Sequence, residues 1–308
     1  MLIEVKNLTK KFGDFVAVND VSFDMREGET LALLGPNGSG KTTTLKCLVG
    51  LAAPTSGWIT VGGFDGARQS REARRLLSYL PQRVNFHDSL TAREVMEFYC
   101  RLRRIPVRRV DELFATEAFH FNGFSNRPVG EFSGGMLQRL GLAVACVPDA
   151  PVLILDEPTV SLDPEGAIQF REFLGALKQR GKTILFSSHM LGDVEKLADR
   201  VGIMVGGRLM ALEAIDSLRE GLARQSRMRI SLTAVDVRFI QAAEHAGAVE
   251  ASIEGNSLIV ASRPEARLAI LDAIEAAGGD VARFATEEPT LEDFYLRYIR
   301  EEQKESHR

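Results

Sequence analysis

The feature that most constrains this chain is a glycine-rich loop between a buried strand and a helix. The run Thr30–Leu34 is continuously apolar after its first residue, as in a strand that is buried on both faces. It leads into Gly35-Pro-Asn-Gly-Ser-Gly-Lys-Thr42, and the residues Thr43–Leu48 then predict a helix. Glycines let such a loop curl until several backbone N–H groups point inward, beside the positive end of the helix. The loop therefore predicts a cradle for a cluster of phosphate groups.

The side chains of this loop suit a nucleoside triphosphate with its magnesium ion. We expect Lys41 to bridge the β- and γ-phosphates and the Thr42 hydroxyl to ligate Mg²⁺. A chance glycine turn is the alternative, but the complete GxxxxGKT pattern between a strand and a helix argues against it. The residues expected to contact the nucleotide here are Gly35, Pro36, Asn37, Gly38, Ser39, Gly40, Lys41, Thr42 and Thr43.

A second motif places two adjacent carboxylates at the end of an apolar strand. Val152–Leu155 is followed at once by Asp156 and Glu157. Nucleotides bind at the carboxyl edge of open α/β sheets, so we expect Asp156 to hold Mg²⁺ through a water molecule. We expect Glu157 to polarise the attacking water as a general base. Capping of the next element is the alternative, but the phosphate loop favours catalysis, and the two motifs together predict hydrolysis of ATP.

Composition limits the partners and the compartment. The chain has 308 residues, 45% of them hydrophobic, and a net charge of −4, which suits a globular protein and argues against a nucleic-acid partner. The cysteines, Cys47, Cys100 and Cys146, are widely spaced and are expected to be thiols in a reducing compartment. The N-terminus lacks a signal peptide's apolar core, and no apolar run approaches the ~20 residues that span a bilayer. Any membrane crossing would therefore come from another chain.

Alternation of buried strands with helices predicts an α/β fold with a largely parallel core sheet. Alternating residues over Ile3–Val21 predict antiparallel strands, and about residues 83–150 are expected to form a helical subdomain. Composition shifts near Ser217, so we expect a nucleotide-binding domain over residues 1–217 and a small α+β domain over residues 218–308. The second domain has a predicted β-α-β-β-α-β order, which is typical of a ferredoxin-like unit.

The helical region carries a capping box and a basic stretch. Thr91-Ala-Arg-Glu94 predicts a helix N-terminus, and Pro106 is expected to end that helix. Arginines then cluster at positions 101, 103, 104, 108 and 109. Two interpretations of these arginines stay open: a solvated helix face, or a contact with anionic lipid headgroups or with an acidic helix of a partner.

Between the two motifs, Ser133-Gly134-Gly135 precedes a helix that continues to Ala143. A helix N-terminus with adjacent glycines is a second anion site, and one nucleotide rarely needs two such sites from one subunit. With this element, about residues 1–220 resemble an ATP-binding-cassette (ABC) ATPase. The resemblance implies that two subunits pair head to tail. The serine and glycines of one subunit then close over the γ-phosphate held by the other.

Four further residues acquire roles only through this resemblance. Phe12 matches the aromatic residue that stacks on adenine, and Asp163 lies in the loop that crosses the dimer interface. Gln82 matches the glutamine that contacts Mg²⁺ and the attacking water and links them to the membrane partner. His189 matches the switch histidine that contacts the γ-phosphate. Taken alone, Phe12 would be assigned to a core, Gln82 to a surface loop and His189 to a structural position.

Two positions depart from the family pattern. The usual signature is Leu-Ser-Gly-Gly-Gln, whereas this chain has Phe132-Ser-Gly-Gly-Met136. Because the serine hydroxyl and the glycine amides carry the phosphate contact, activity should survive. Because Met136 lacks the side-chain amide of the usual glutamine, the affinity of the signature segment for the nucleotide is in question. Val160 replaces the small residue common before Ser161, which we interpret as a packing change.

The C-terminal extension, with Glu288-Pro-Thr-Leu-Glu-Asp-Phe-Tyr295, resembles ATPases of type-2 exporter-like systems, whose partner is a permease. Over the whole chain the resemblance is closest to the ATPase subunit of the ABC system for copper-site assembly of nitrous-oxide reductase. It implies a homodimer that uses ATP and Mg²⁺ at the cytoplasmic face of the inner membrane. Its partners would be an integral permease and, in that system, a periplasmic accessory protein.

Alternatives remain for the function and for the C-terminal domain. Another exporter-like system would move drugs, lipids or polysaccharides. The chain could instead be a soluble ABC ATPase of DNA repair or translation. Its single cassette and its net negative charge make this alternative less consistent with the sequence. The C-terminal domain is expected either to sense a ligand or to add dimer contact area. No copper site is expected, because the cysteines are scattered and the five histidines are unclustered.

Overall fold

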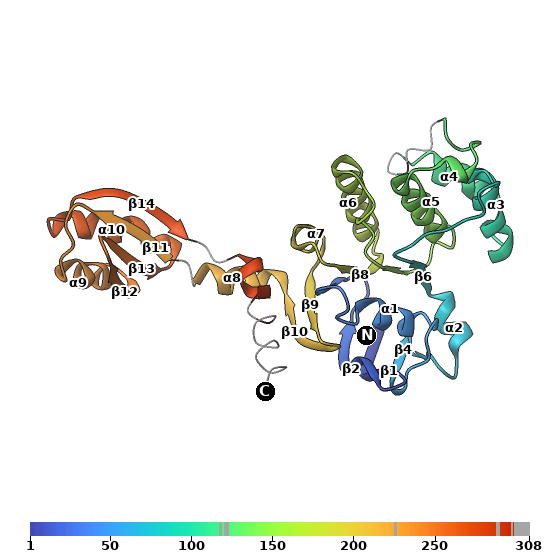
Figure 1. Cartoon of the computed structure of the whole chain (residues 1–308), viewed down its shortest axis with the longest axis horizontal. Helices are drawn as coiled ribbons and strands as arrows, with labels where there is room; N and C mark the ends of the chain where they lie inside the picture. The colour runs from blue at the N-terminus through green and yellow to red at the C-terminus, as the bar shows by residue number, and fades with distance from the viewer. Residues whose placement is uncertain (117–118, 120–122, 225–226, 288–289, 297, 299–308) are drawn as a thin grey trace. The chain divides into compact units, whose positions relative to one another are not determined.

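The computed structural model describes residues 1–116, 119, 123–224, 227–287, 290–296 and 298 (Figure 1). The chain divides into two compact units, Met1–Glu213 and Ala214–Arg308. This division lies a few residues before the boundary expected near Ser217, so helix α8 (Ile215–Arg224) belongs with the second unit. Each unit has its own hydrophobic core and is described separately.

A six-stranded sheet forms the centre of the first unit. Its strands are β3 (Thr30–Leu34), β6 (Leu77–Leu80), β7 (Val152–Leu155), β8 (Thr183–Ser188), β9 (Arg200–Val205) and β10 (Arg208–Ala214). Their order across the sheet is β10-β9-β3-β8-β7-β6, and the pairs from β9 to β6 are all parallel, which confirms the predicted core. Every residue of β3, β7 and β8 is buried, as expected for a sheet covered on both faces.

Helices alternate with these strands along the chain, as predicted (Figure 1). They are α1 (Lys41–Leu48) after β3, α2 (Ser70–Arg75) before β6, α6 (Pro164–Gln179) after β7 and α7 (Leu191–Leu197) after β8. Each predicted catalytic motif therefore lies in a turn that leads from a buried strand towards a helix.

A second sheet of the first unit is antiparallel, with the order β2-β1-β4-β5, and shares one hydrophobic core with the central sheet. Its strands are β1 (Ile3–Phe12), β2 (Phe15–Met25), β4 (Ser56–Val61) and β5 (Phe64–Asp65). Alternate side chains of β1 and β2, such as Leu8 and Val18, are buried against Leu31 of β3 and Leu45 of α1 in one cluster. This shared core fixes the antiparallel sheet against the phosphate loop.

The helical subdomain contains α3 (Ala92–Arg103), α4 (Arg108–Phe114), a 3₁₀ turn η2 (Val129–Glu131) and α5 (Gly134–Cys146). The predicted capping box at the start of α3 is confirmed, because the Thr91 and Glu94 side chains each bond the other's backbone N–H. At its end, Arg104 adopts a left-handed conformation just before Pro106. The predicted helix boundaries thus arise from local backbone chemistry.

One face of α3 borders an apolar hollow of about 550 Å³. The hollow is lined by Asn85, Phe86, His87, Leu90, Val95, Phe98 and Tyr99. Phe98 is 56% exposed and Leu102, one turn further along the helix, is 63% exposed. This apolar face of α3 is therefore only partly covered by the described residues.

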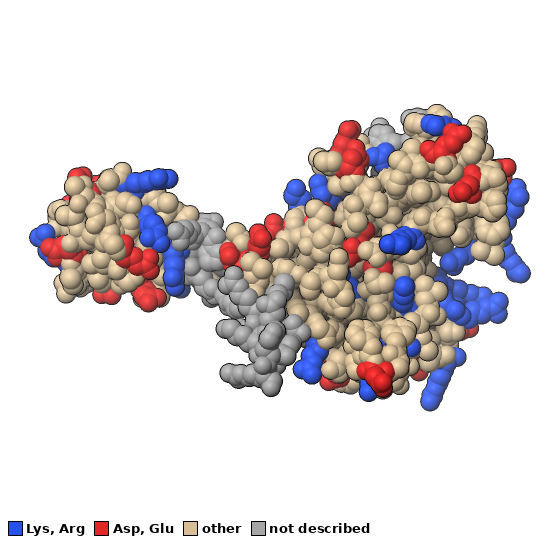
Figure 2. Space-filling model, viewed as in Figure 1, with Lys and Arg blue, Asp and Glu red and all other residues tan. Residues whose placement is uncertain are grey.

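The basic stretch at the end of α3 and the start of α4 is not uniform. Arg101 pairs with Glu97, and Arg109 pairs with Glu112 and is partly buried. Arg103, Arg104 and Arg108 are exposed. Figure 2 shows Lys and Arg side chains projecting from the edge of the first unit where Figure 1 places α2 and α3.

After α8, the second unit consists of alternating strands and helices around a four-stranded sheet. Its elements are β11 (Arg227–Leu232), α9 (Arg238–His245), β12 (Ala248–Glu254), β13 (Ser257–Ser262), η3 (Pro264–Ala266), α10 (Arg267–Ala276) and β14 (Val281–Glu287). The sheet order is β12-β13-β11-β14 with every pair antiparallel, which is the arrangement of a split β-α-β unit. Within the motif Glu288–Tyr295, Glu288 and Pro289 lie outside the described residues.

Candidate active site

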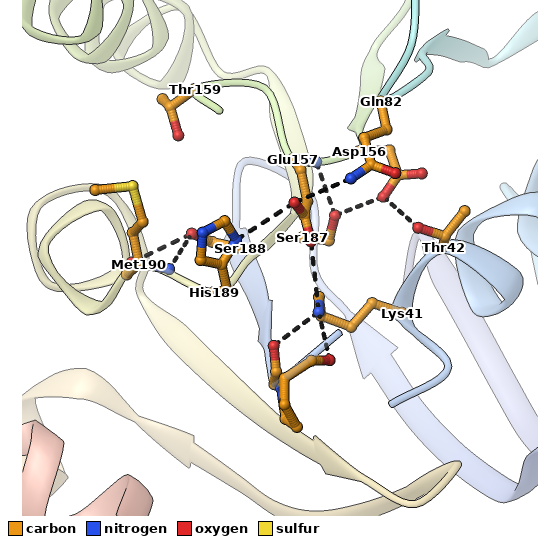
Figure 3. Close-up of polar contacts among 12 residues, drawn as sticks. Lys41, Thr42, Gln82, Asp156, Glu157, Thr159, Ser187, Ser188, His189 and Met190 are labelled. Atoms are coloured by element: carbon orange, nitrogen blue, oxygen red, sulfur yellow. Dashed lines mark hydrogen bonds and ion pairs between the residues drawn. The ribbon is translucent and has the colours of Figure 1, made fainter. Parts of the chain in front are cut away.

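Parallel strands bring the predicted catalytic motifs to one edge of the sheet. β3, β8 and β7 are neighbours and run in the same direction, so their carboxyl ends meet. The glycine loop follows β3, Asp156 and Glu157 follow β7, and His189 follows β8. Figure 3 shows the side chains of Lys41 and Thr42 directed towards these carboxylates. The structure thus gathers residues from three distant parts of the sequence.

Lys41 lies in the middle of this cluster with its side chain buried. Its ammonium donates to the backbone oxygens of Gly35 at 2.7 Å and Pro36 at 3.1 Å, and lies 3.6 Å from Glu157 Oε1. Burial lowers the pKa of Lys41, and the nearby carboxylates of Glu157 and Asp156 oppose that shift. A cation held in this way can exchange carbonyl contacts for the stronger contact with a phosphate oxygen.

The phosphate loop needs glycine at its tight points. Gly40 has a φ of 97°, and a β-carbon there would lie 2.6 Å from the backbone oxygen of Ala17. A β-carbon on Gly35 would overlap the backbone oxygen of Met204. Helix α1 begins after Gly40 without a side-chain cap, so its first N–H groups face the loop and can receive an anion.

The fully buried carboxylate of Asp156 collects hydroxyl groups from three elements. Oδ1 accepts hydrogen bonds from Thr42 Oγ1 at 2.9 Å and Ser187 Oγ at 2.7 Å, and Oδ2 accepts from the Tyr79 hydroxyl at 3.4 Å. Burial, together with this neighbouring carboxylate, raises the pKa of Tyr79, so its hydroxyl stays a donor. Thr42 and Asp156 thus present adjacent oxygen atoms, which are the ligands that Mg²⁺ prefers.

Glu157 is held both at its backbone N–H and at its carboxylate. Its Oε2 accepts a hydrogen bond from Gln82 Nε2 at 3.1 Å and lies 3.3 Å from His189 Nδ1 (Figure 3). Its N–H donates to Ser187 Oγ at 2.9 Å, and its φ of 46° lies in the left-handed region that residues other than glycine rarely adopt. A buried carboxylate held at a strained turn beside an exposed imidazole is well placed to act as a general base.

These groups fit ATP with its magnesium ion. Lys41 and the N–H groups at the start of α1 suit the phosphates, while the oxygens of Thr42, Asp156 and Gln82 suit the cation. When bound, Mg²⁺ neutralises negative charge on the phosphates. The individual roles of Gln82, Glu157 and His189 remain predictions that the geometry supports.

Sequence reasoning missed two members of this cluster. Ser187, the next-to-last residue of β8, donates to Asp156 and accepts from the N–H of Glu157, so it joins the two acidic residues. Tyr79, on β6, reaches the other oxygen of Asp156. Ser187 could have been found from its position two residues before His189, at the end of a buried strand. Nothing in the sequence around Tyr79 signals its contact.

The signature segment lies at the start of another helix. Ser133 caps α5, and its Oγ accepts a hydrogen bond from the N–H of Met136 at 3.3 Å. Ser133 and Gly134 are exposed. Within the described parts of the chain, no hydrogen bond or ion pair joins Ser133 to the residues around Lys41. The structure therefore separates the predicted phosphate contacts into two groups.

Asp163 caps the neighbouring helix α6. Its Oδ1 accepts from the N–H of Gly166 at 3.2 Å and lies 3.7 Å from Arg139 Nη2. The backbone oxygen of Ser161, in the same loop, approaches Gly135 closely. The predicted interface loop and the signature glycines are thus side by side, and their pairing with a second subunit remains a prediction.

Phe12 lies apart from both groups, at the end of β1. Its ring is 55% exposed, and Lys10 Nζ lies 4.8 Å from the ring centre. An aromatic face that is open to solvent can stack on a base, and this role stays a prediction. The remaining loop residues lie where the sequence predicts, before or within the first turn of α1; they are Asn37, Gly38, Ser39 and Thr43.

Comparisons with known proteins identify the family. The family described as "ABC transporter" matches residues 18–160. The uncharacterized ABC transporter ATP-binding protein YxlF of Bacillus subtilis is 35% identical over 304 residues, which cover 97% of this chain and 99% of that protein. The chain belongs to the ABC transporter ATP-binding subunits. A further ABC relative, the Nod factor export ATP-binding protein I of Burkholderia orbicola, is 40% identical over 220 residues, 71% of this chain and 72% of its own length.

Solved structures of ABC cassettes share the fold. An ATP-binding subunit of an ABC transporter aligns with a TM-score of 0.66 and 30% identity, over 72% of this chain and 93% of the other. A dimeric cassette in a post-hydrolysis state, bound to ADP and Pi, aligns with a TM-score of 0.64 and 26% identity, over 69% and 98%. The chain is therefore an ABC ATPase that uses ATP, with Mg²⁺ as the usual partner ion. This confirms the predicted fold class, enzyme class and cofactors.

Proposed function

We propose that this ABC ATPase acts as a head-to-tail homodimer that drives a separate integral membrane subunit of an export system. The observation that carries the proposal is the separation of its two phosphate-binding groups. The group around Lys41 is buried and rich in ligands, whereas the Ser133 end of α5 is open and caps only its own helix. A second copy in the opposite orientation would bring its Ser133 end to the phosphates held by Lys41. The dimeric cassette bound to ADP and Pi is a relative that pairs.

The roles within one composite site follow from the contacts. Lys41 and the α1 N-terminus hold the β- and γ-phosphates, and Thr42, Asp156 and Gln82 hold the magnesium ion. Glu157 Oε2 accepts a proton from the attacking water, while His189 contacts the γ-phosphate and keeps Glu157 in place. Phe12 stacks on adenine, and the Asp163 loop crosses to the partner copy.

Support for a membrane partner comes from the surface of the helical subdomain. Within the described residues, no helix combines the length and the apolar character needed to cross a bilayer. The apolar hollow beside α3, with exposed arginines at the end of that helix and at the start of α4, offers a docking place for a short helix of a permease. We propose that the ATPase works as a peripheral subunit on the cytoplasmic face of the inner membrane.

The names of the relatives support an export role. They include a Nod factor export protein of Burkholderia orbicola and a linearmycin resistance protein of Bacillus subtilis, 40% and 30% identical to this chain. We propose that the exported substrate is a drug, a lipid or a polysaccharide, which the membrane subunit would select.

A narrower hypothesis assigns the chain to copper-site assembly of nitrous-oxide reductase, with a periplasmic accessory protein as a further partner. It rests on overall resemblance alone. Among the described residues, no group of three or more His, Cys, Asp or Glu side chains is arranged to hold a metal ion. Deleting the gene and measuring the copper content of the reductase would test it, and an unchanged content would exclude this role.

The second unit is proposed to regulate the ATPase or to extend the dimer contact. Its separate core supports an independent module. Truncation after Ser217 should lower dimer affinity if the unit adds contact area. If the unit senses a ligand, the truncation should instead change only how turnover responds to the membrane partner.

One experiment tests the homodimer directly. Purified Glu157→Gln protein with Mg-ATP should elute as a dimer in size-exclusion chromatography with light scattering, because ATP stays bound between the copies. The same variant with ADP, and the Lys41→Ala variant with ATP, serve as controls and should remain monomeric. If the ATP-loaded Glu157→Gln protein is strictly monomeric, with and without the membrane subunit, the proposal is wrong.

A further inference from the structure

A buried polar contact joins the segments that carry Glu157 and His189, on the side away from the phosphates. Thr159 lies two residues after Glu157, and Asp193 lies four residues after His189, in the first turn of α7. Thr159 Oγ1 donates a hydrogen bond to Asp193 Oδ2 at 2.6 Å. In Figure 3 the Thr159 side chain points away from Glu157 and the phosphate loop, so this contact is not part of the phosphate site.

The contact is isolated from water and balanced in charge. Thr159 is 7% exposed and Asp193 is 3% exposed. Arg171, from α6, donates to the other oxygen of Asp193 at 2.8 Å, which compensates the buried carboxylate. Both oxygens of Asp193 are therefore engaged, one by an arginine and one by the Thr159 hydroxyl. A short charge-assisted hydrogen bond at a buried site restrains its partners strongly.

The segment that carries His189 leads into a short helix. Helix α7 spans only Leu191–Leu197 and begins without a side-chain cap. The turn before it is held locally, by the N–H of Met190 donating to Ser188 Oγ at 2.9 Å. Asp193 reaches out of this segment to two other elements. Its contact with Thr159 joins α7 to the turn that carries Glu157.

Two connections therefore span the same pair of segments. On the phosphate side, His189 Nδ1 lies 3.3 Å from Glu157 Oε2. On the far side, Thr159 is bonded to Asp193. We propose that Thr159 and Asp193 are positioning residues, which set His189 against Glu157 and so fix the general base for attack on the γ-phosphate. This inference rests on the proposed roles of Glu157 and His189.

The test replaces the Thr159 hydroxyl without changing its shape. Thr159→Val removes the hydrogen bond and leaves the Asp193–Arg171 pair intact, so the fold should survive. Thr159→Ser retains the hydroxyl and serves as the rescuing variant. Ser78→Ala is a matched control, because Ser78 is buried on β6 and donates its hydroxyl to the backbone oxygen of Ala145, away from His189. Each full-length variant is assayed for kcat, for ATP affinity and for thermal stability.

We expect Thr159→Val to lower kcat by about tenfold, which is the effect of losing one buried hydrogen bond to a charged group. Its affinity for ATP should stay within about twofold of that of the parent. Thr159→Ser should keep kcat close to that of the parent. Ser78→Ala should lower the melting temperature without a comparable loss of kcat. In a His189→Ala background, Thr159→Val should have no further effect on kcat, because the residue that it positions is gone.

The possible failures are distinguishable. Suppose first that His189→Ala lowers turnover but Thr159→Val leaves kcat unchanged; the positioning role is then wrong, while the proposed site stands. The same conclusion follows if Thr159→Val lowers kcat as much in the His189→Ala background as it does in the parent. If Thr159→Val and Ser78→Ala lose kcat and stability in the same proportion, the contact is only structural. If His189→Ala keeps full turnover, the proposed role of His189 fails and this inference fails with it.

Discussion

The N-termini of α1 and α5 are both built to receive an anion, yet they differ in almost every physical respect. The α1 end follows a buried strand, lies beside a buried lysine and has two carboxylates within reach. The α5 end follows a 3₁₀ turn, exposes Ser133 and Gly134, and uses the serine hydroxyl to cap its own helix. One end contains the reactive groups, and the other offers mainly backbone N–H groups and a hydroxyl.

This difference indicates a division of labour. A site that holds a cation, metal ligands and a general base can bind ATP by itself. An open helix end without these groups adds affinity only when another surface supplies the phosphate. We therefore expect damage at α1 to affect binding or chemistry within one chain. Damage at α5 should affect only events that need two chains.

The largest expected effect isolates chemistry at the α1 side. Glu157→Gln should lower kcat by ~10²-fold or more, the range for a removed general base, because the amide cannot accept the proton of the attacking water. ATP affinity should persist, since Lys41 and the loop are unchanged. Steady-state ATPase rates and equilibrium binding of ATP measure the two quantities. Normal hydrolysis by this variant would refute the assignment of the base.

The next effect compares the two helix ends in binding. Lys41→Ala should weaken ATP binding by about 10- to 100-fold, because a charge-assisted contact to phosphate is lost. Ser133→Ala should leave the affinity of the dilute, monomeric chain for ATP within about twofold, since in the proposed dimer that residue would contact the nucleotide of the partner copy. Isothermal titration at low protein concentration measures both. Equal losses in the two variants would contradict the division of labour.

Mixing these two variants sharpens the comparison further. In a head-to-tail dimer of Lys41→Ala with Ser133→Ala, both defects fall in one composite site and the other site is intact. When the two inactive preparations pair at random, half of the dimers are mixed, and each mixed dimer has one intact site out of two. Mixing should therefore restore up to about a quarter of the parental ATPase rate. If both groups served the same chain, neither site would be intact, and mixing would restore nothing.

The smallest effect concerns the buried end of α5. Burial raises the pKa of Cys146 from an ordinary 9.0 to about 12. The folded chain therefore holds this thiol proton more tightly, so its contribution to stability is complete below pH 9 and is lost as the pH rises towards 12. Between pH 8 and pH 10, urea unfolding should show a loss of about 1 kcal/mol that Cys146→Ala lacks. An equal loss in that variant would show that another group titrates.

Local patterns predicted most of the elements in both units. The run Val152–Leu155 and the capping box at Thr91 appear at the predicted residues, because burial and capping are encoded within a few positions. In the second unit, the 3₁₀ turn Pro264–Ala266 precedes α10, which starts at Arg267. The order of strands across the sheet could not be derived, since neighbouring strands are far apart in the sequence.

The candidate site was predictable in its residues but not in its bonding. Motifs and family resemblance pointed to Lys41, Asp156 and Glu157, which the structure brings together. The bonds that Ser187 and Tyr79 donate to Asp156 join side chains from different strands, so their partners could not be read from the local sequence. The same is true of the bond between Thr159 and Asp193, whose partners lie on different elements.

The close approach of Gly40 to the oxygen of Ala17 has a consequence for binding kinetics. Strand β2 touches the phosphate loop at that point, and the turn after β9 also bonds it, with the Gly207 N–H donating to the backbone oxygen of Ser39 at 3.2 Å. The loop is therefore preorganised by two distant segments before any ligand arrives. Little conformational freedom is left to lose on capture, so association should follow a single encounter step without a slow loop rearrangement.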